Sequence, residues 1–347
     1  MAALLRLHMN ESPYPPPRLA IEYVAKYAEL MNFYEVEWLE EELLARLEGY
    51  AGAPREYLDF YPGSSYALTL MLAMARARGL EIVTPHPTFH VLYPLFDGFG
   101  VVHVRHALSS GFEMDPEGFL RAAEGRVAYI ANPNNPTGNI LVDDPGYFSR
   151  LARVAKYVFI DETYYEFSGF TAKDAALEHD NVVVLRSLSK AFSLAGARFG
   201  YAIAGRRARE ALASLRIGVE TPVTTQAAAL GALSDVGYAR RLAAEIVSTR
   251  ELVGRRLAEM GIRNIPSRTN FVLIDVGERC GPVWEGLRAR GILTLCLEHA
   301  RGLEEYANYM RVTIGRPEDM ELFLEALGEL AGQHWRPTEE GKGKRKL

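Results

Sequence analysis

The chain has 347 residues, of which 48% are hydrophobic and 24% are charged, and this composition is typical of a globular protein with a large core. Its formal net charge of -5 argues against binding to nucleic acid or to an anionic membrane surface. The first seven residues are too short and too weakly apolar for a signal peptide, and no stretch approaches the roughly 20 apolar residues of a membrane span. Cys280 and Cys296 are too few for a disulfide framework, although these two could bridge in the fold, and this cysteine usage predicts a cytoplasmic protein.

The opening of the chain is rich in proline. Residues 12–17 read Ser-Pro-Tyr-Pro-Pro-Pro, which can form neither a helix nor a central strand. We expect an extended arm that lies on a surface.

Short apolar runs alternate with helical patterns between about residues 55 and 220. Nearly all-apolar runs are typical of strands in a sheet that is covered on both faces. The expected strands are 81–83, 101–104, 127–130, 157–160, 182–185 and 199–203. The expected helices are 66–78, 116–123, 145–155 and 206–215, and the second and third begin at a proline that follows an aspartate. This alternation predicts a doubly wound α/β domain.

The pattern changes after Asp235 to that of a compact α+β unit. The expected elements are a long helix at 238–260, a strand at 271–275, a helix at 283–290, a strand at 310–314 and a last helix at 317–330. We therefore divide the chain into an arm that belongs to the small domain (1–30), a large domain (31–235), a small C-terminal domain (236–335) and a disordered basic tail (336–347).

One lysine stands out, because arginine carries nearly all the other positive charge before residue 340. Lys190 lies in Ser-Leu-Ser-Lys-Ala (187–191), directly after the expected strand 182–185. Open α/β folds bind their ligands at the carboxyl edge of the sheet, where this amine would lie. Lysine, unlike arginine, can form a Schiff base with a carbonyl cofactor. The sequence therefore predicts a reactive amine at Lys190.

Polar residues also follow two neighbouring strands. Asn135 lies in Asn-Pro-Asn-Asn-Pro-Thr-Gly (132–138), which taken alone is equally typical of a tight surface turn. Asp161 and Tyr164 follow the next strand, where the aspartate could instead cap a helix. Arg198 comes eight residues after Lys190. Packing alone does not explain this series of groups at successive strand ends.

In the order and spacing of these residues, the chain resembles the fold type I, pyridoxal-phosphate-dependent aminotransferases of class I/II along nearly its whole length. Within the class, the start Asn-Glu-Ser-Pro-Tyr (10–14), the asparagine loop, residues 188–196 and Arg-Val-Thr-Ile-Gly (311–315) look most like the histidinol-phosphate aminotransferase branch. The resemblance implies a mainly parallel seven-stranded sheet in the large domain, pyridoxal 5'-phosphate as cofactor and a homodimer with a shared active site.

The resemblance also implies roles for individual residues. Lys190 would carry the cofactor, Asp161 would face its ring nitrogen, and Asn135 and Tyr164 would donate to its phenolate oxygen. Phe89 would stack on the ring, although it could instead be a core phenylalanine. The phosphate dianion would be held at the start of a helix by Ser64 and Ser65, by Ser187, Ser189 and Arg198, and by Tyr34 of the neighbouring subunit; a Gly-Ser-Ser segment alone could equally be a helix cap.

Two further positions would bind substrate. Arg311 matches the family's arginine for the substrate anion, unless it forms a surface ion pair, and Tyr14 on the arm could close over the substrate. The chain departs from the histidinol-phosphate branch where a second phosphate-binding arginine usually follows Gly-Ile, because residues 294 and 295 are Thr294 and Leu295. Arg301 could replace that arginine from a different loop path.

The eight histidines show no metal-ligand spacing. His86 and His90 are four residues apart, but Pro87 between them prevents the helix that would bring them together. We therefore expect no metal site and interpret the histidines as structural or exposed.

The predicted function is ping-pong transfer of an amino group from L-histidinol phosphate to 2-oxoglutarate. The alternatives are transamination of aromatic or other amino acids, a threonine-phosphate decarboxylase-like reaction, and a ligand-sensing protein that kept the fold.

Overall fold

Seven strands form one mixed sheet in the computed structural model, which describes residues 4–334. The strand order is β2-β8-β7-β6-β5-β3-β4; the five strands from β7 to β4 run parallel, whereas β8 runs antiparallel to both of its neighbours. The central strands are the buried apolar runs that the sequence predicts, and the doubly wound, mainly parallel seven-stranded sheet is confirmed. The strands are β2 (Leu58–Tyr61), β3 (Ile82–His86), β4 (His103–Ala107), β5 (Val127–Ala131), β6 (Tyr157–Asp161), β7 (Val182–Ser187) and β8 (Gly200–Ala204).

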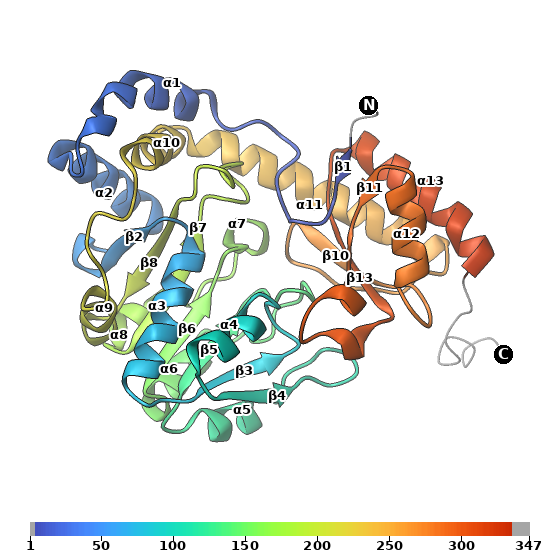
Figure 1. Cartoon of the computed structure of the whole chain (residues 1–347), viewed down its shortest axis with the longest axis horizontal. Helices are drawn as coiled ribbons and strands as arrows, with labels where there is room; N and C mark the ends of the chain where they lie inside the picture. Colours follow the sequence, from blue (N-terminus) through green and yellow to red (C-terminus); the bar gives the residue numbers. More distant parts are fainter. Residues whose placement is uncertain (1–3, 335–347) are drawn as a thin grey trace.

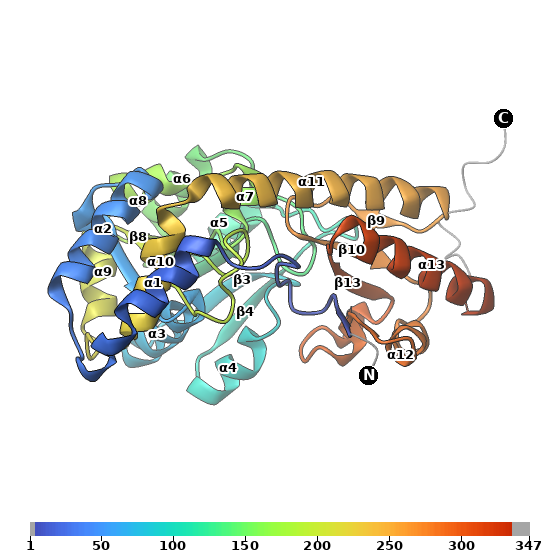
Figure 2. The same cartoon turned by 90° about the horizontal axis from the view of Figure 1, so that it is seen from above.

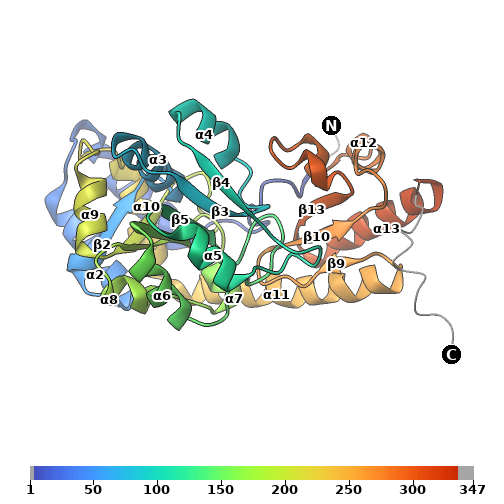
Figure 3. The same ribbon diagram turned by 90° about the horizontal axis from the view of Figure 1, so that it is seen from below.

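Helices cover both faces of this sheet. Alternate residues of each strand point to opposite faces, so each strand packs against both layers of helices. Val183 and Leu185 pack toward α3 and α9, whereas Val182 and Val184 belong to the core on the other side. Figure 3 shows α3 and α6 on opposite sides of the strands. One layer contains α3 (Ser64–Ala77), α4 (Leu92–Phe99) and α9 (Arg206–Ala213); the other contains α5 (Pro116–Ala123), α6 (Gly146–Val154), α7 (Tyr165–Ser168) and α8 (Lys173–Glu178).

A second, antiparallel sheet lies in the C-terminal part of the chain, with the order β12-β13-β10-β9. The long helix α11 runs from the large sheet to this smaller one (Figure 2). The elements are α11 (Val236–Glu259), β9 (Asn264–Ile265), β10 (Phe271–Asp275), α12 (Gly281–Ala289), β12 (Leu295–Cys296), β13 (Tyr309–Thr313) and α13 (Pro317–His334). No helix within residues 4–334 is long and apolar enough to cross a bilayer.

The N-terminal segment divides between the two sheets, which corrects the expectation that residues 1–30 belong with the small domain. Strand β1 (Leu5–Arg6) pairs with β11 (Ile292–Leu293) beside the smaller sheet, and residues 12–17 form neither helix nor strand, as predicted. Helix α1 (Arg18–Tyr27) instead packs on α10 (Val223–Leu233), which also packs on α2 (Glu37–Ala51), at the far end of the large sheet (Figure 1). Gly231 permits this contact, because a Cβ there would lie 2.3 Å from the carbonyl oxygen of Leu19.

The other domain boundaries stay predictions, and the expected basic tail at 336–347 lies outside the described residues.

Helices α1, α2 and α10 are absent from the sequence-based expectation. Helix α10 is buried on nearly every side, so its sequence lacks the polar stripe by which an amphipathic helix is recognised.

Cys280 and Cys296 form a disulfide, which is the bridge that the sequence left open and which a prediction of a cytoplasmic protein does not favour. Cys280 precedes α12 and Cys296 lies in β12, and both are buried. The sequence separation of 16 did not reveal this pairing, because only the fold of the small domain brings the start of α12 against β12.

We expect reduction of this disulfide to lower the free energy of unfolding by about 3 kcal/mol. A disulfide that closes a loop of this length reduces the conformational entropy of the unfolded chain, and reduction restores that entropy. Urea unfolding with and without reductant measures the difference. The double variant Cys280→Ala/Cys296→Ala is the control and should not respond to reductant. Equal stability of the oxidised and the fully reduced protein would contradict the expectation.

Candidate active site

A cavity of about 410 Å³ lies at the carboxyl edge of the large sheet, where the loops that follow β5, β6 and β7 meet β13 and the N-terminal arm. Eleven of the thirteen site residues expected from the sequence line it. They are Ser64, Ser65, Phe89, Asn135, Asp161, Tyr164, Ser187, Ser189, Lys190, Arg198 and Arg311.

Lys190 follows β7 in a tight loop, and its Nζ atom donates to the carbonyl oxygen of Met9, at 3.2 Å. Burial, and then the positive charge of Arg311, lower the pKa of Lys190 to about 8. About a tenth of this amine is therefore neutral, and so nucleophilic, at pH 7, far more than of a lysine with an ordinary pKa.

Asp161 is the last residue of β6, and hydrogen bonds hold its carboxylate in place. Oδ1 accepts from the backbone nitrogen (3.0 Å) and the hydroxyl (2.5 Å) of Thr163, and Oδ2 accepts from the Tyr129 hydroxyl at 3.0 Å. Burial raises the pKa of Asp161, while these hydrogen bonds and the charge of Lys190 oppose that rise. The carboxylate does not cap a helix, since the residue at the cap of α7 is Tyr164. It is a fixed acceptor in the cavity wall.

Tyr164 and Asn135 lie side by side in the cavity wall. The Tyr164 hydroxyl oxygen accepts from Nδ2 of Asn10 at 2.9 Å and from Nδ2 of Asn135 at 3.4 Å. Burial raises the pKa of Tyr164 to about 12, so the hydroxyl keeps its proton. The asparagine segment is thus part of a buried site and not a surface turn.

The start of α3 and the loop after β7 form a cradle of anion-binding groups. Arg198 Nη2 donates to Oγ of Ser65 at 3.0 Å, and the hydroxyls of Ser187 and Ser189 are 2.9 Å apart. Gly63 has a φ of +88°, and a Cβ there would lie 2.5 Å from Arg198 Nη2, so only glycine leaves room for the guanidinium. Hydroxyls, a guanidinium and a helix N-terminus together suit a phosphate dianion.

Arg311 lies in β13 and points into the cavity from the smaller sheet. It is only 3% exposed, which rules out a surface ion pair. It donates to Oδ1 of Asn135 at 2.7 Å and to the carbonyl oxygen of His8 at 2.6 Å, and burial lowers its pKa to about 10. Its Nε has no partner in the described part of the chain, so a donor is left for an anionic ligand.

Two expected site residues do not line the cavity of their own chain. The Tyr14 hydroxyl donates to Glu245 on α11, and its ring lies 5.3 Å from the Arg316 guanidinium. Tyr34 precedes α2 and is 84% exposed. The structure therefore does not place Tyr14 over the cavity in this conformation.

His90 and Asn10 line the cavity, although neither was expected there. The sequence interpretation of the histidines as structural or exposed did not place His90 at the cavity. Burial and the nearby charge of Arg311 lower the pKa of His90 to about 4, and its Nδ1 lacks a partner among the described residues. Its position directly after Phe89 was the one signal in the sequence.

The position of the missing arginine lies next to Arg311. Leu295 of β12 pairs with Arg311 of β13 in the register of the smaller sheet. Arg301 instead donates to the carboxylate of Asp97 at 2.9 Å and does not line the cavity. Arg301 therefore does not supply the second arginine to the cavity of its own chain.

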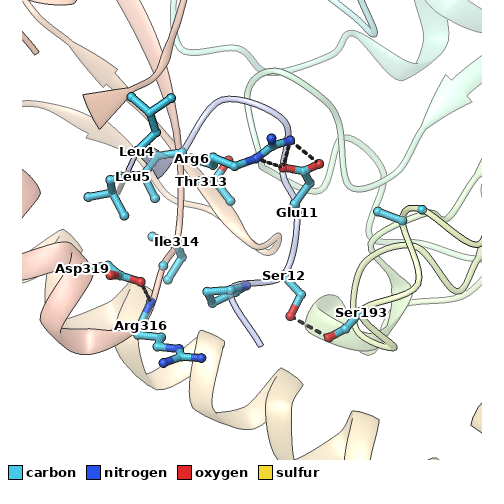
Figure 4. Close-up of a pocket in the computed structure, with 15 residues that line it drawn as sticks. Leu4, Leu5, Arg6, Glu11, Ser12, Ser193, Thr313, Ile314, Arg316 and Asp319 are labelled. Carbon is cyan, nitrogen blue, oxygen red and sulfur yellow. Dashed lines mark hydrogen bonds and ion pairs between the residues drawn. The ribbon is translucent and has the colours of Figure 1, made fainter. Parts of the chain in front are cut away.

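A second cavity, of about 500 Å³, lies on the other side of the N-terminal arm (Figure 4). Glu11, Ala195 and Gly196 line both cavities, so the arm forms the partition between them. The arm is held by the ion pair of Arg6 with Glu11 and by the hydrogen bond from Ser193 to Ser12, at 2.7 Å.

The comparisons with known proteins agree with this geometry. Residues 6–327 match the family model for aminotransferases of class I and II. Histidinol-phosphate aminotransferases from Sulfurisphaera tokodaii (30% identity; 94% of this chain, 90% of the relative) and Geobacter sp. strain M21 (32%; 95% and 93%) are similar along nearly their whole lengths.

A solved structure of the same fold is that of histidinol-phosphate aminotransferase from Sinorhizobium meliloti in complex with pyridoxal-5'-phosphate. It superposes with a TM-score of 0.81 at 23% identity, over 94% of this chain and 90% of that one. From the family match and the two relatives of at least 30% identity, the chain belongs to the class I and II aminotransferases and is a transaminase that uses pyridoxal 5'-phosphate.

Proposed function

We propose that the enzyme transfers the amino group of L-histidinol phosphate to 2-oxoglutarate in a ping-pong reaction of cytoplasmic histidine biosynthesis. The observation that supports this most is the convergence of Lys190, Asp161 and the buried Arg311 on one cavity. The names of the similar enzymes from Sulfurisphaera tokodaii and Geobacter favour this amino donor.

The residues of the cavity fit the cofactor group by group. The cradle of Ser64, Ser65, Ser187, Ser189 and Arg198 would hold its phosphate; Asp161 would face the ring nitrogen and Phe89 a face of the ring. Asn135 and Tyr164 would donate to the phenolic oxygen. When bound, pyridoxal phosphate supplies an electron sink for the electrons of the substrate α-carbon.

Lys190 has two tasks in this proposal. Its amine tethers the cofactor covalently until the amine of the substrate replaces it. The released amine, with a pKa of about 8, would then take the proton from the substrate α-carbon and return it to the C4′ atom of the cofactor. Arg311 holds the anionic group of the substrate so that the α-carbon lies near Lys190.

A specific observation keeps a second candidate open. Leu295, which is in register with Arg311, cannot make a second phosphate contact as an arginine would, and it does not itself line the cavity. Transamination of an aromatic amino acid is therefore the alternative.

The reaction of the apoenzyme with pyridoxal phosphate tests the role of Lys190. We expect its rate to rise with pH around a midpoint near 8, well below the value of an exposed lysine, because only the neutral amine attacks the carbonyl. Stopped-flow absorbance measures this rate. Borohydride reduction followed by peptide mapping should place the label on residue 190, and Lys190→Ala should not be labelled. A label elsewhere would falsify the assignment.

An amino-donor panel with histidinol phosphate, threonine phosphate and aromatic and acidic amino acids tests the substrate. Arg311→Lys should raise the KM for histidinol phosphate about 10- to 100-fold, because charged hydrogen bonds are lost. The matched control Arg301→Lys lies outside the cavity and should leave KM unchanged. Turnover of aromatic donors without turnover of histidinol phosphate would exclude the proposed substrate in favour of the alternative.

We also propose a homodimer in which Tyr34 reaches the cofactor phosphate of the partner. The segment from α1 to the start of α2, which lies at one end of the molecule (Figure 1), exposes large apolar side chains on both sides of Tyr34 in the sequence: Ile21, Met31, Phe33 and Trp38. Such a cluster is typical of a protein–protein interface.

Mixing of inactive subunits tests the shared site. Tyr34→Ala and Lys190→Ala should regain activity when their subunits are mixed, because one site of the mixed dimer then carries neither change. The control pair is Lys190→Ala with Asp161→Asn, whose residues lie in the cavity of the same chain and which should not complement. A monomer in sedimentation, or no recovery for the first pair, would contradict the proposal.

A further inference from the structure

Asn10 occupies an unusual position for a residue of an N-terminal arm. Its side chain is 1% exposed, and its backbone has a φ of +53°, in the left-handed region. Non-glycine residues adopt this conformation mainly where surrounding contacts hold them. The contacts of Asn10 reach both sheets: Tyr164 after β6, Thr313 at the end of β13, and Asn270 just before β10.

The hydrogen bonds of Asn10 fix the orientation of its amide. The Thr313 hydroxyl accepts from the backbone nitrogen of Asn10 at 3.0 Å and donates its single proton to Oδ1 of Asn10 at 3.1 Å. The oxygen of the amide therefore faces Thr313, and its nitrogen faces Tyr164. Asn270 holds the carbonyl oxygen of Asn10 at 3.1 Å. In this arrangement Asn10 can only donate to Tyr164.

This donation determines how the Tyr164 hydroxyl can act. The hydroxyl oxygen accepts from Asn10 at 2.9 Å and more weakly from Asn135 at 3.4 Å. Its own proton is then left to be donated into the cavity. A phenol that accepts a hydrogen bond is a stronger donor, and the contact with Asn10 opposes the rise in the pKa of Tyr164 that burial causes.

We propose that Asn10 is a positioning residue, which acts through Tyr164: its amide holds the tyrosine hydroxyl as a donor to the phenolic oxygen of the cofactor. The inference rests on the proposed function of Tyr164. Residues of the arm next to Asn10 also bind the site, since Arg311 donates to the His8 carbonyl and Lys190 to the Met9 carbonyl. Opening of the arm would therefore change the cofactor environment and the substrate site together.

The absorbance of the bound cofactor provides a readout that does not depend on activity. Donation to the phenolic oxygen disfavours protonation of the nitrogen that joins Lys190 to the cofactor, and that protonation changes the visible spectrum. Asn10→Ala should raise the pH midpoint of this change by roughly 0.5 to 1 unit, the equivalent of one hydrogen bond of about 1 kcal/mol. In a Tyr164→Phe background, Asn10→Ala should cause no further shift.

Two additional variants keep the test decisive if Asn10→Ala does not fold. Thr313→Val removes the group that orients the amide, and it should shift the midpoint in the same direction only when Tyr164 is present. Ser12→Ala, the control, removes an arm contact that does not involve Asn10, and it should leave the midpoint unchanged.

The outcomes separate this inference from the proposed function. If Asn10→Ala shifts the midpoint equally with Tyr164 present and in the Tyr164→Phe background, or shifts it in neither, the inference alone is overturned. A midpoint that Tyr164→Phe itself leaves unchanged would overturn both the inference and the proposed role of Tyr164. The choice of amino donor does not enter, because the titration contains no donor.

Discussion

The site depends on one geometric constraint, the parallel alignment of β5, β6 and β7. Because these strands run in the same direction, their carboxyl ends lie at one edge of the sheet, and the residues that follow them meet although they are far apart in sequence. Asn135, Asp161 and Lys190 reach one cavity for this reason. A single reversed strand would place one of the three groups at the opposite edge.

A buried ion pair beside the site reinforces this alignment. Arg186, next to Ser187, donates from Nε to Oε2 of Glu162, next to Asp161, at 2.9 Å, and both side chains are almost fully buried. Loss of one partner of such a pair leaves an unpaired buried charge, which typically costs about 3 to 5 kcal/mol. The pair therefore fixes the phosphate side of the cavity relative to the carboxylate side.

The smaller sheet and the arm complete the cavity through polar contacts. Arg311 binds Asn135 across the two sheets, and residues 8–10 of the arm bind Arg311, Lys190 and Tyr164. Hydrogen bonds that are shielded from water are stronger, and unpaired buried groups are costly, so these contacts hold the arm against the cavity. The substrate and the cofactor would compete for the same donors.

Local sequence patterns were enough to predict the central strands in chain order, most of the helices between and after them, and Lys190, Asp161, Asn135 and Arg198 as neighbours. Those patterns are apolar runs, helix starts, and polar residues directly after strands. The resemblance to the aminotransferases added Arg311 and Phe89, whose positions no local pattern reveals.

The remaining features arise from the way the two sheets and the arm pack together. The disulfide, the packing of α1 on α10, the exposure of Tyr34, the entry of His90 into the cavity and the contact of Asn10 with Tyr164 all join segments that are distant in sequence or depend on which way a side chain faces. Local patterns specify an element and its buried face, but a contact between distant residues is fixed only when the packing of both sheets brings them together.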